Sequence, residues 1–216
     1  MKSFAVIGIG LFGKKLACDL FDAGHTVLAI DHRESHIEEI ADSVSRAATV
    51  DAKNREALAQ LGIQKYDCVI VATSSDLATS VIITMNLRAL NVPEIICKVK
   101  TETDKEILET LGASICITPE HIAATKLARR LCAKNILDFT KLTDNHSIVE
   151  IEVPRSWVGK SVIELSVRAN FNVNIMAIRR SSEMTVDFAP TEVLQAQDIL
   201  ILIGNNKDLD KLEKLS

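Results

Sequence analysis

The sequence predicts an α/β protein: a doubly wound parallel sheet, completed by a crossover helix and followed by a small α+β domain. Three observations support this prediction. A glycine-rich turn follows the first apolar strand, strands and helices then alternate as far as residue 118, and short strands replace that alternation from residue 147. We therefore place the first domain at residues 1–134, a linker at 135–146 and the second domain at 147–216.

The opening stretch, FAVIGIGLFGKKLACDLFDAGHTVLAID, contains Gly8, Gly10 and Gly13 in the order G-x-G-x-x-G. In this Rossmann-like arrangement the first glycine permits a tight turn, the second lets a pyrophosphate approach the backbone, and the third lets the helix pack on the strand. Asp31 ends the second strand 18 residues after Gly13, near the expected place of a ribose-binding acid. The alternative to a dinucleotide site is a glycine turn that no longer binds a ligand and serves only the packing of the helix on the strand. Asp31 favours an unphosphorylated ribose, while the nearby Arg33 leaves open whether the ribose of the ligand carries a 2′-phosphate.

Alternating elements continue beyond this turn. The expected strands are Phe4–Ile9, Thr26–Asp31, RAATV at 46–50, Cys68–Thr73, EIICKV at 94–99 and SICIT at 114–118. The expected helices are Leu11–Ala23, Glu34–Val44, Asn54–Leu61, Leu77–Leu90 and Lys105–Leu111. Ligands of such sheets bind at the carboxyl ends of the strands. Polar residues at those ends are therefore candidates, with helix capping as the alternative for any single one: Asp51, Thr73, Ser74 and Lys98.

Pro119 opens the crossover helix, PEHIAATKLARRLCAKN, with Glu120 in its first turn. Its apolar residues Ile122, Leu127 and Leu131 form an incomplete stripe that needs a partner. We expect LDFTKLTDNH to be a connection. Four short strands follow, SIVEIEV, NVNIMAIRR, EMTVDFAP and DILILIG, with one short helix at Ser161–Ser166.

Composition excludes several classes of protein. The chain has 216 residues, 47% of them hydrophobic, a net charge of −4 and no basic block, so we expect no binding to nucleic acid. It shows neither a signal-peptide pattern nor an apolar run of about 18 residues, so we expect a cytoplasmic protein. The five cysteines form no C-x-x-C pair, and we expect buried, reduced thiols.

Catalytic motifs are missing from the sequence. There is no G-x-S-x-G, no H-E-x-x-H and no Walker A lysine motif, and the second domain contains neither histidine nor cysteine. His32 and His36 are four residues apart on an expected helix and could hold a metal. Because no third ligand is evident, we expect a solvated helix face instead. The pattern favours a nucleotide that is bound and sensed.

Eight stretches, taken in order and spacing, point to one family: FAVIGIGLFGKK, VLAID, CVIVATSSD, VPEIICKVK, LGASICITPE, SIVEIEVP, LSVRANFNVNIMAIRR and DILILIG. Together they resemble the cytosolic regulatory subunits of Trk/Ktr potassium-uptake systems, built from an RCK (regulator of potassium conductance) N-terminal domain and an RCK C-terminal domain. The resemblance implies an octameric ring on the inner face of the cell membrane, beneath a potassium channel subunit. It also implies that the crossover helix packs on a dimer partner.

In that family an adenine nucleotide in the Rossmann cleft changes the shape of the ring and gates potassium flux. The resemblance implies ATP, ADP or NAD(H) as the ligand here, and no enzymatic activity. Glu120 stands where relatives have a carboxylate that helps to hold a divalent cation, Mg²⁺ or Ca²⁺. The residues that we assign to the cleft are Gly8, Gly10, Leu11, Phe12, Gly13, Asp31, His32, Asp51, Ala52, Thr73, Ser74, Lys98 and Glu120.

The sequence departs from the family pattern at Leu11. Many relatives have arginine at this position, where the guanidinium reaches a terminal phosphate of a neighbouring nucleotide. Leucine supplies neither the charge nor the donors. Discrimination between ATP and ADP is therefore open. NAD(H), ADP or AMP could suit the cleft better, or the switch could lie in the second domain.

In relatives from several bacteria the second domain binds cyclic di-AMP at its dimer interface. The matching residues here are Ile163, Arg168, Asn174, Ile175 and Pro190. Arg168 would contact a phosphate, Asn174 would form hydrogen bonds, and the apolar residues would cover the adenines. A plain dimer interface is the alternative.

Two other functions compete with a regulatory subunit. An NAD-dependent oxidoreductase would need a substrate pocket and turnover. A nucleotide-sensing transcription factor would need a DNA-binding module, for which we expect room at neither terminus. The sequence leaves open the physiological ligand, whether it activates or inhibits, the channel partner and the oligomeric state.

Overall fold

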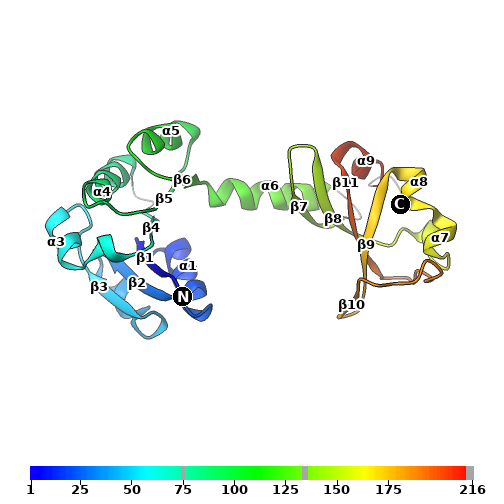
Figure 1. Cartoon of the computed structure of the whole chain (residues 1–216), viewed down its shortest axis with the longest axis horizontal. Coiled ribbons are helices and arrows are strands. Elements are labelled where there is room, and N and C mark those ends of the chain that lie inside the picture. Colours follow the sequence, from blue (N-terminus) through cyan, green and yellow to red (C-terminus); the bar gives the residue numbers. More distant parts are fainter. Residues whose placement is uncertain (74–75, 133–135, 213–216) are drawn as a thin grey trace. The chain divides into compact units, whose positions relative to one another are not determined.

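A computed structural model of the chain describes residues 1–73, 76–132 and 136–212 (Figure 1). The chain divides into two compact units, Met1–Pro119 and Glu120–Ser216. The crossover helix therefore falls in the second unit, although the sequence pattern assigns it to the first domain. No helix within the described ranges is both long enough and apolar enough to cross a bilayer.

The first unit contains a six-stranded parallel sheet in the order β3-β2-β1-β4-β5-β6, which confirms the doubly wound prediction. Its strands are β1 (Ser3–Ile7), β2 (Thr26–Asp31), β3 (Arg46–Thr49), β4 (Cys68–Val71), β5 (Ile95–Lys98) and β6 (Ile115–Ile117). Strands β1 to β3 follow one another toward one edge of the sheet, and β4 to β6 follow one another toward the opposite edge, so the strand order reverses between the neighbours β1 and β4. Such a switch point leaves a crevice at the carboxyl ends of the strands.

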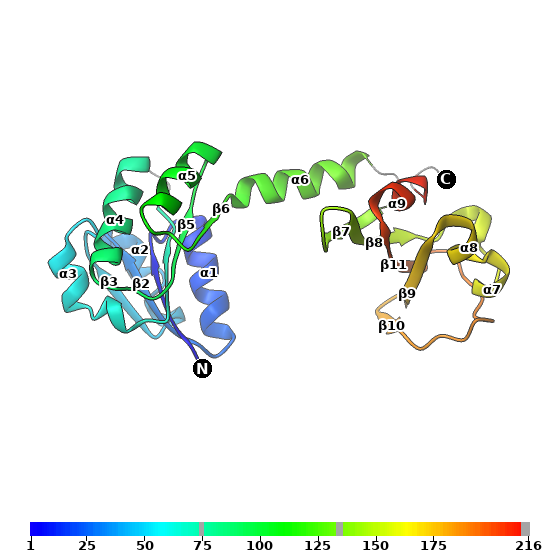
Figure 2. The same cartoon turned by 45° about the horizontal axis from the view of Figure 1, so that its top comes forward.

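Helices cover both faces of this sheet, as the two views of the unit show (Figures 1 and 2). They are α1 (Leu11–Asp22), α2 (Glu34–Glu38), α3 (Arg55–Gln60), α4 (Leu77–Ala89) and α5 (Glu102–Thr110), with 3₁₀ turns at Ala41–Ser43 and Ile63–Lys65. Strand residues alternate between two cores: Ala5 and Ile7 pack with α3, α4 and α5, and Val6 packs with α1 and α2. Burial of both faces explains why β1, β2 and β4 read as continuous apolar runs.

Two helices differ from the sequence expectation. The helix expected at Glu34–Val44 ends at Glu38, and only a 3₁₀ turn follows. The helix expected at Lys105–Leu111 begins earlier, at Glu102, because Thr101 and Asp104 form a capping box. Reciprocal bonds of this kind satisfy the first free N–H groups of a helix.

The second unit contains the crossover helix α6 (Pro119–Cys132) from its second residue onward, and a five-stranded antiparallel sheet in the order β10-β9-β11-β8-β7. The strands are β7 (Ile136–Lys141), β8 (His146–Glu152), β9 (Val173–Arg180), β10 (Glu183–Thr185) and β11 (Ile199–Asn205). The remaining helices are α7 (Val162–Leu165), α8 (Val167–Phe171) and α9 (Asn206–Leu212), with a 3₁₀ turn at Arg155–Trp157. Buried residues of β8, β9 and β11 pack with these three helices into one core.

The expected connection at 135–146 is not all linker. Residues 136–141 form β7, which pairs with β8 and places Phe139 opposite Val149 against the core of the unit. Cross-strand pairing, which no local sequence signal announces, makes this stretch a strand. In the stretch EMTVDFAP only Glu183–Thr185 is a strand. Helix α8 was not expected; left-handed Ser166 (φ 45°) separates it from α7.

Candidate functional site

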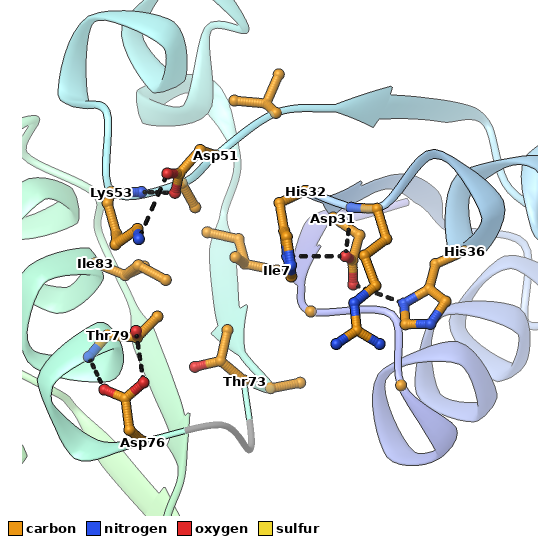
Figure 3. A pocket seen from close by; sticks show the side chains of 16 residues that line it. Ile7, Asp31, His32, His36, Asp51, Lys53, Thr73, Asp76, Thr79 and Ile83 are labelled. Atoms are coloured by element: carbon orange, nitrogen blue, oxygen red, sulfur yellow. Dashed lines mark hydrogen bonds and ion pairs between the residues drawn. The ribbon is translucent and has the colours of Figure 1, made fainter.

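A cavity of about 370 Å³ opens at the carboxyl ends of β1, β2, β3 and β4, at the switch point (Figure 3). Sixteen residues line it: Ile7, Gly8, Gly10, Asp31, His32, Arg33, His36, Val50, Asp51, Ala52, Lys53, Ala72, Thr73, Asp76, Thr79 and Ile83. In Figure 3, Asp31 and the two histidines form one side of the cavity, and Asp51, Lys53, Asp76 and Thr79 lie across from them. The volume lies in the range of small-molecule sites, about 300–1,000 Å³.

The three glycines of the turn meet different physical demands. Gly8 has a positive φ of 96°, and a Cβ there would lie 2.9 Å from the Thr73 nitrogen. A Cβ on Gly13 would lie 2.0 Å from the Gly8 carbonyl oxygen, so α1 can approach the turn only without a side chain. Gly10 has an ordinary φ of −82°, and a Cβ there would meet nothing within 4 Å. Neither backbone conformation nor packing within the chain explains glycine at position 10.

The N-terminus of α1 is open to an anion. Gly10 is its N-cap residue, no side chain caps its free N–H groups, and no acidic residue lies in the first turn. Free amides and the positive end of the helix dipole favour phosphate at such a terminus. Gly10, whose Cβ position is open space, directly precedes these amides.

Asp31 ends β2 and is only 6% exposed. Its Oδ2 accepts a hydrogen bond from the Ile9 N–H (2.7 Å) and contacts His36 Nδ1 (3.1 Å). Its Oδ1 accepts from the Arg33 N–H (2.9 Å) and lies 3.2 Å from His32 Nδ1. Burial by itself would raise the pKa of Asp31, but the bonds from Arg33, Ile9 and His36 outweigh it and lower the pKa. Asp31 is thus an ionised acid that also holds the glycine turn.

Polar groups on the opposite side of the cavity are tied to their own elements. The Asp51 carboxylate accepts from the Lys53 N–H at 3.0 Å. Thr73 Oγ1 and Ser80 Oγ share a hydrogen bond of 3.0 Å. Asp76 caps α4 by accepting from the Thr79 N–H (2.7 Å), a bond that lowers the pKa of Asp76. Capping of α4 and the turn after Asp51 account for the two carboxylate contacts, and each group retains further acceptor capacity toward the cavity.

The cavity brings together many of the residues assigned to the cleft from sequence. Those that line it are Gly8, Gly10, Asp31, His32, Asp51, Ala52 and Thr73. Others do not line it: Leu11, Phe12, Gly13 and Lys98. Ser74 lies outside the described residues, and Glu120 belongs to the second unit. The role of each as a ligand contact stays a prediction.

Leu11, Phe12 and Lys98 lie close to the glycine turn without lining the cavity. Leu11 is 97% exposed, the first residue of α1. Lys98 Nζ lies 5.8 Å from the centroid of the Phe12 ring, within the range of a cation–π contact. Lys98 also lines a separate space of about 20 Å³, which Thr73 and Asp76 share with the larger cavity.

Sequence reasoning missed several lining residues, of which His36 matters most. We expected a solvated helix face for the two histidines; that expectation is wrong for His36, which is 28% exposed and contacts Asp31. Its spacing of five residues from Asp31 was the available signal, but only the turn between β2 and α2 brings the two side chains together. Lys53, Asp76 and Thr79 were missed as lining residues because the loop after β3 and the start of α4 place them.

Among the described residues, no group of three or more histidines, cysteines, aspartates or glutamates could hold a metal ion. Glu120 is exposed in the first turn of α6. Its part in holding a divalent cation stays a prediction.

A second cavity, of about 620 Å³, opens on the second unit between α7, α8 and β9. Its lining is mainly apolar: Val162, Ile163, Ser166, Val167, Arg168, Ala169, Asn172, Val173, Asn174, Ile175 and Phe188. Four of the residues assigned to cyclic di-AMP lie here. Pro190 does not line the cavity, but its carbonyl oxygen accepts a 2.8 Å bond from the Ile163 N–H. Ser166 and Asn172, which border the cavity, both have positive φ.

Comparison with known proteins agrees with this two-part organisation. Residues 4–119 match the TrkA-N domain and residues 147–216 match the TrkA-C domain. The chain is 35% identical to Ktr system potassium uptake protein C of Bacillus subtilis (strain 168), covering 99% of this chain and 96% of that protein. It is 34% identical to Ktr system potassium uptake protein A of the same organism, covering 98% and 96%.

Among solved structures, the GsuK channel bound to NAD matches with a TM-score of 0.68 at 20% identity, covering 99% of this chain and 39% of that chain. A likeness at this identity shows the fold alone. KtrA- and KtrC-type proteins are regulatory subunits without enzymatic activity, which excludes the oxidoreductase alternative. With both domains matched in order and full-length identity above 30%, the chain belongs to the TrkA-N/TrkA-C family of Ktr potassium-uptake proteins.

Proposed function

We propose that this protein is a regulatory subunit that binds an adenine nucleotide or NAD(H) at the glycine turn and thereby controls potassium flux through a Trk/Ktr-type membrane channel subunit. The observation that carries the ligand assignment is Gly10. Its φ is ordinary and a Cβ would meet nothing, so the reason for glycine must be something outside the chain. A pyrophosphate that approaches the backbone is such a reason.

The remaining groups of the cavity suit a nucleotide. The uncapped amides of α1 lie next to Gly10 and favour phosphate oxygens. Asp31, ionised at the end of β2, stands where a ribose hydroxyl would donate. The cations Arg33 and Lys53 line the same space. Leu11 offers no charge for a terminal phosphate, so the cavity itself gives ATP no added contact over ADP from this position.

The test is titration of the full chain with ADP and with NAD by calorimetry, in the natural protein and in Gly10→Val. A Cβ at this position meets nothing within 4 Å, so valine adds bulk beside the amides of α1 from a position where its first carbon has space. We expect nucleotide affinity to fall at least about tenfold while the thermal midpoint is preserved. Ala23→Val, a matched change at the exposed C-terminal end of α1, should leave affinity unchanged. Equal affinity in all three proteins contradicts the assignment.

A second ligand, cyclic di-AMP, is proposed for the cavity between α7, α8 and β9. Arg168 supplies a cation, Asn174 an amide, and Ile163 and Ile175 apolar surface within one cavity. Ile163 is 60% exposed in the single chain. Cyclic di-AMP has a two-fold axis, so two copies of the cavity would contact its two halves with the same residues. Calorimetry should then find one molecule bound per dimer of the full chain.

Self-association follows from the same proposal. Ile122, Leu127 and Leu131 of α6 are all more than half exposed in the single chain. A second copy would cover them, in a dimer that is a building block of an octameric ring. Light scattering over a concentration series should give a dimer or larger species. A monomer at micromolar concentration, with and without nucleotide, contradicts this assembly.

The channel subunit is the remaining partner. We place the protein in the cytoplasm, at the inner face of the membrane, through that contact. Glu120 and a divalent cation would add to phosphate binding in the assembled form. Potassium uptake into vesicles that contain the channel subunit tests the function directly. Addition of this protein should make uptake depend on nucleotide. If uptake changes neither with this protein nor with nucleotide, the proposed function is rejected.

A further inference from the structure

The carboxylate expected to bind ribose is already occupied by the protein. Asp31 Oδ2 accepts from the Ile9 N–H and contacts His36 Nδ1, and Oδ1 accepts from the Arg33 N–H and lies next to His32 Nδ1. Each carboxylate oxygen accepts about two hydrogen bonds. Both acceptor directions of Oδ2 are therefore in use, whereas Oδ1 accepts one hydrogen bond, and Figure 3 shows both imidazoles turned toward the carboxylate. A ribose hydroxyl cannot donate to Oδ2 unless one of its two contacts opens.

We propose that His36 is a specificity-determining residue that competes with the ribose hydroxyls for Asp31, so that protonation of His36 weakens recognition of the ribose. This inference rests on the proposed nucleotide site. The two backbone N–H contacts belong to the glycine turn and to the residue after β2, and their loss would disturb the fold. The histidine side chains can rotate away, which makes them the contacts that a ligand displaces.

His36 is the stronger of the two competitors. Its Nδ1 lies 3.1 Å from Asp31 in hydrogen-bond geometry, and its side chain is only 28% exposed. His32 lies 3.2 Å from Oδ1, but its side chain is 67% exposed and so more readily exchanged for water. Both imidazoles line the cavity, so a displaced ring has space to enter.

The charges around His36 set the sign of the effect. On its own helix and just beyond lie Glu34 and Glu39, and Glu39 interacts with His36 while it pairs with Lys14 of α1 at 2.8 Å. From the end of β2 come Asp31, His32 and the cation Arg33. The bonds to Asp31 lower its pKa, so this carboxylate stays charged in mild acid. A protonated His36 then forms an ion pair with Asp31, whereas a neutral imidazole forms only a hydrogen bond, so acid strengthens the competitor.

The experiment compares two ligands that differ only in the ribose hydroxyls: ADP and 2′,3′-dideoxy-ADP. The ratio of their dissociation constants measures what the hydroxyls contribute, and protonation of the phosphate cancels because both ligands share it. Calorimetry on the full chain at about pH 8 and about pH 5.5 spans the ordinary titration range of histidine. The proteins are the natural chain, His36→Ala, His36→Gln, and His146→Ala as a histidine control in the other unit.

In the natural chain we expect the preference for ADP over the dideoxy analogue to fall at least about threefold from pH 8 to pH 5.5, because acid favours an ion pair between His36 and Asp31 over a neutral hydrogen bond. In His36→Ala the preference should be larger and should change less than about twofold with pH. Glutamine still donates to Asp31 but does not titrate. His36→Gln should therefore give a smaller preference than alanine and the same weak pH dependence, and His146→Ala should follow the natural chain.

Three results overturn the inference. If the preference for ADP over the dideoxy analogue does not change with pH in the natural chain, His36 does not compete with the ribose hydroxyls as proposed. A lower preference in both His36 variants shows that His36 contacts the ribose instead of competing with it. Absence of binding by both ligands in the natural chain rejects the proposed nucleotide site together with this inference, which distinguishes the two failures. Circular dichroism at both pH values verifies that each variant is folded.

Discussion

Asp31 in the first unit and Asp198 in the second are the two buried acids among the described residues, at 6% and 1% exposure. Both have lowered pKa values, yet they are held differently. Asp198 is bound by Arg180, whose Nε and Nη2 each lie 2.8 Å from a carboxylate oxygen, and by the Gln195 N–H at 2.8 Å. Asp31 is bound by two backbone N–H groups and by the His36 imidazole. The His32 imidazole lies next to it, and both imidazoles border a cavity.

The difference separates a structural acid from a binding acid. The partners of Asp198 belong to the unit's own strand and loop, with Glu192 and the Val193 carbonyl oxygen as further acceptors for Arg180. None of them faces the cavity of the second unit. Part of the Asp31 environment is exchangeable and faces a space large enough for a ligand. Burial or a perturbed pKa alone would not have told the two apart.

The largest effect is expected at Asp198. Asp198→Ala removes the carboxylate from Arg180 and leaves the Gln195 N–H without an acceptor. We expect a loss of about 3 kcal/mol in the free energy of unfolding, at the low end for broken buried pairs because Arg180 reaches solvent. Urea denaturation measures it. An equal loss in Asp31→Ala, with unchanged nucleotide affinity, would erase the distinction between the two acids.

The pH dependence of Asp198 follows from the Arg180 bond, which lowers its pKa despite burial. A lowered folded pKa contributes stability above the unfolded value of about 3.9, and this contribution disappears as pH falls through the folded pKa. Asp198→Asn should therefore reduce the acid sensitivity of the second unit below about pH 4.

The next effect concerns the ligand of the second unit. Arg168→Ala should weaken cyclic di-AMP binding at least about a hundredfold, because each dimer loses two charged contacts of roughly 1.5–3 kcal/mol. Nucleotide binding at the glycine turn should stay intact. Arg155→Ala, at an exposed arginine that does not line the cavity, is the matched control. Calorimetric titration of the full chain decides, and equal affinity in both variants would leave the cavity as an assembly surface.

Asp31→Ala tests the binding acid. Loss of a hydrogen bond to a charged group costs roughly 1.5–3 kcal/mol, so nucleotide affinity should fall about 10- to 150-fold. The variant also frees the Ile9 N–H, so its melting temperature must be measured in parallel. A stable variant with full affinity would make Asp31 a purely structural acid like Asp198.

Leu11→Arg should have the smallest effect. Leu11 is 97% exposed at the first position of α1, so arginine fits without repacking. The natural chain should bind ATP and ADP with affinities within about tenfold of each other, and arginine should widen the gap in favour of ATP. Leu11→Lys supplies a positive charge without the guanidinium group, and Leu11→Met supplies a long side chain without charge, so the two variants are the controls for charge and for length. A natural chain that strongly prefers ATP would mean that another residue contacts the γ-phosphate.

Much of this organisation was determined by the sequence itself. The spacing of Gly8, Gly10 and Gly13 and the acid 18 residues later predicted the turn, the switch point and the place of the cavity, because these features depend on local backbone geometry. Continuous apolar runs predicted the parallel sheet, because both faces of each strand are buried. Four of the five residues assigned to cyclic di-AMP likewise lie around one cavity.

Tertiary structure decided which distant segments pair and which side chains meet, and the spacing of residues in the sequence carries no information on either. The strand β7 exists because Phe139 pairs across to Val149 and packs in the core, although its stretch reads as a connection. Two turns bring His36 and Ile9 to the same carboxylate of Asp31, from positions 5 and 22 residues away. Partners of a buried group come from whichever elements pack around it, and packing is a property of the folded chain. The sequence therefore determined where a ligand would approach, and the fold determined which side chains compete with it there.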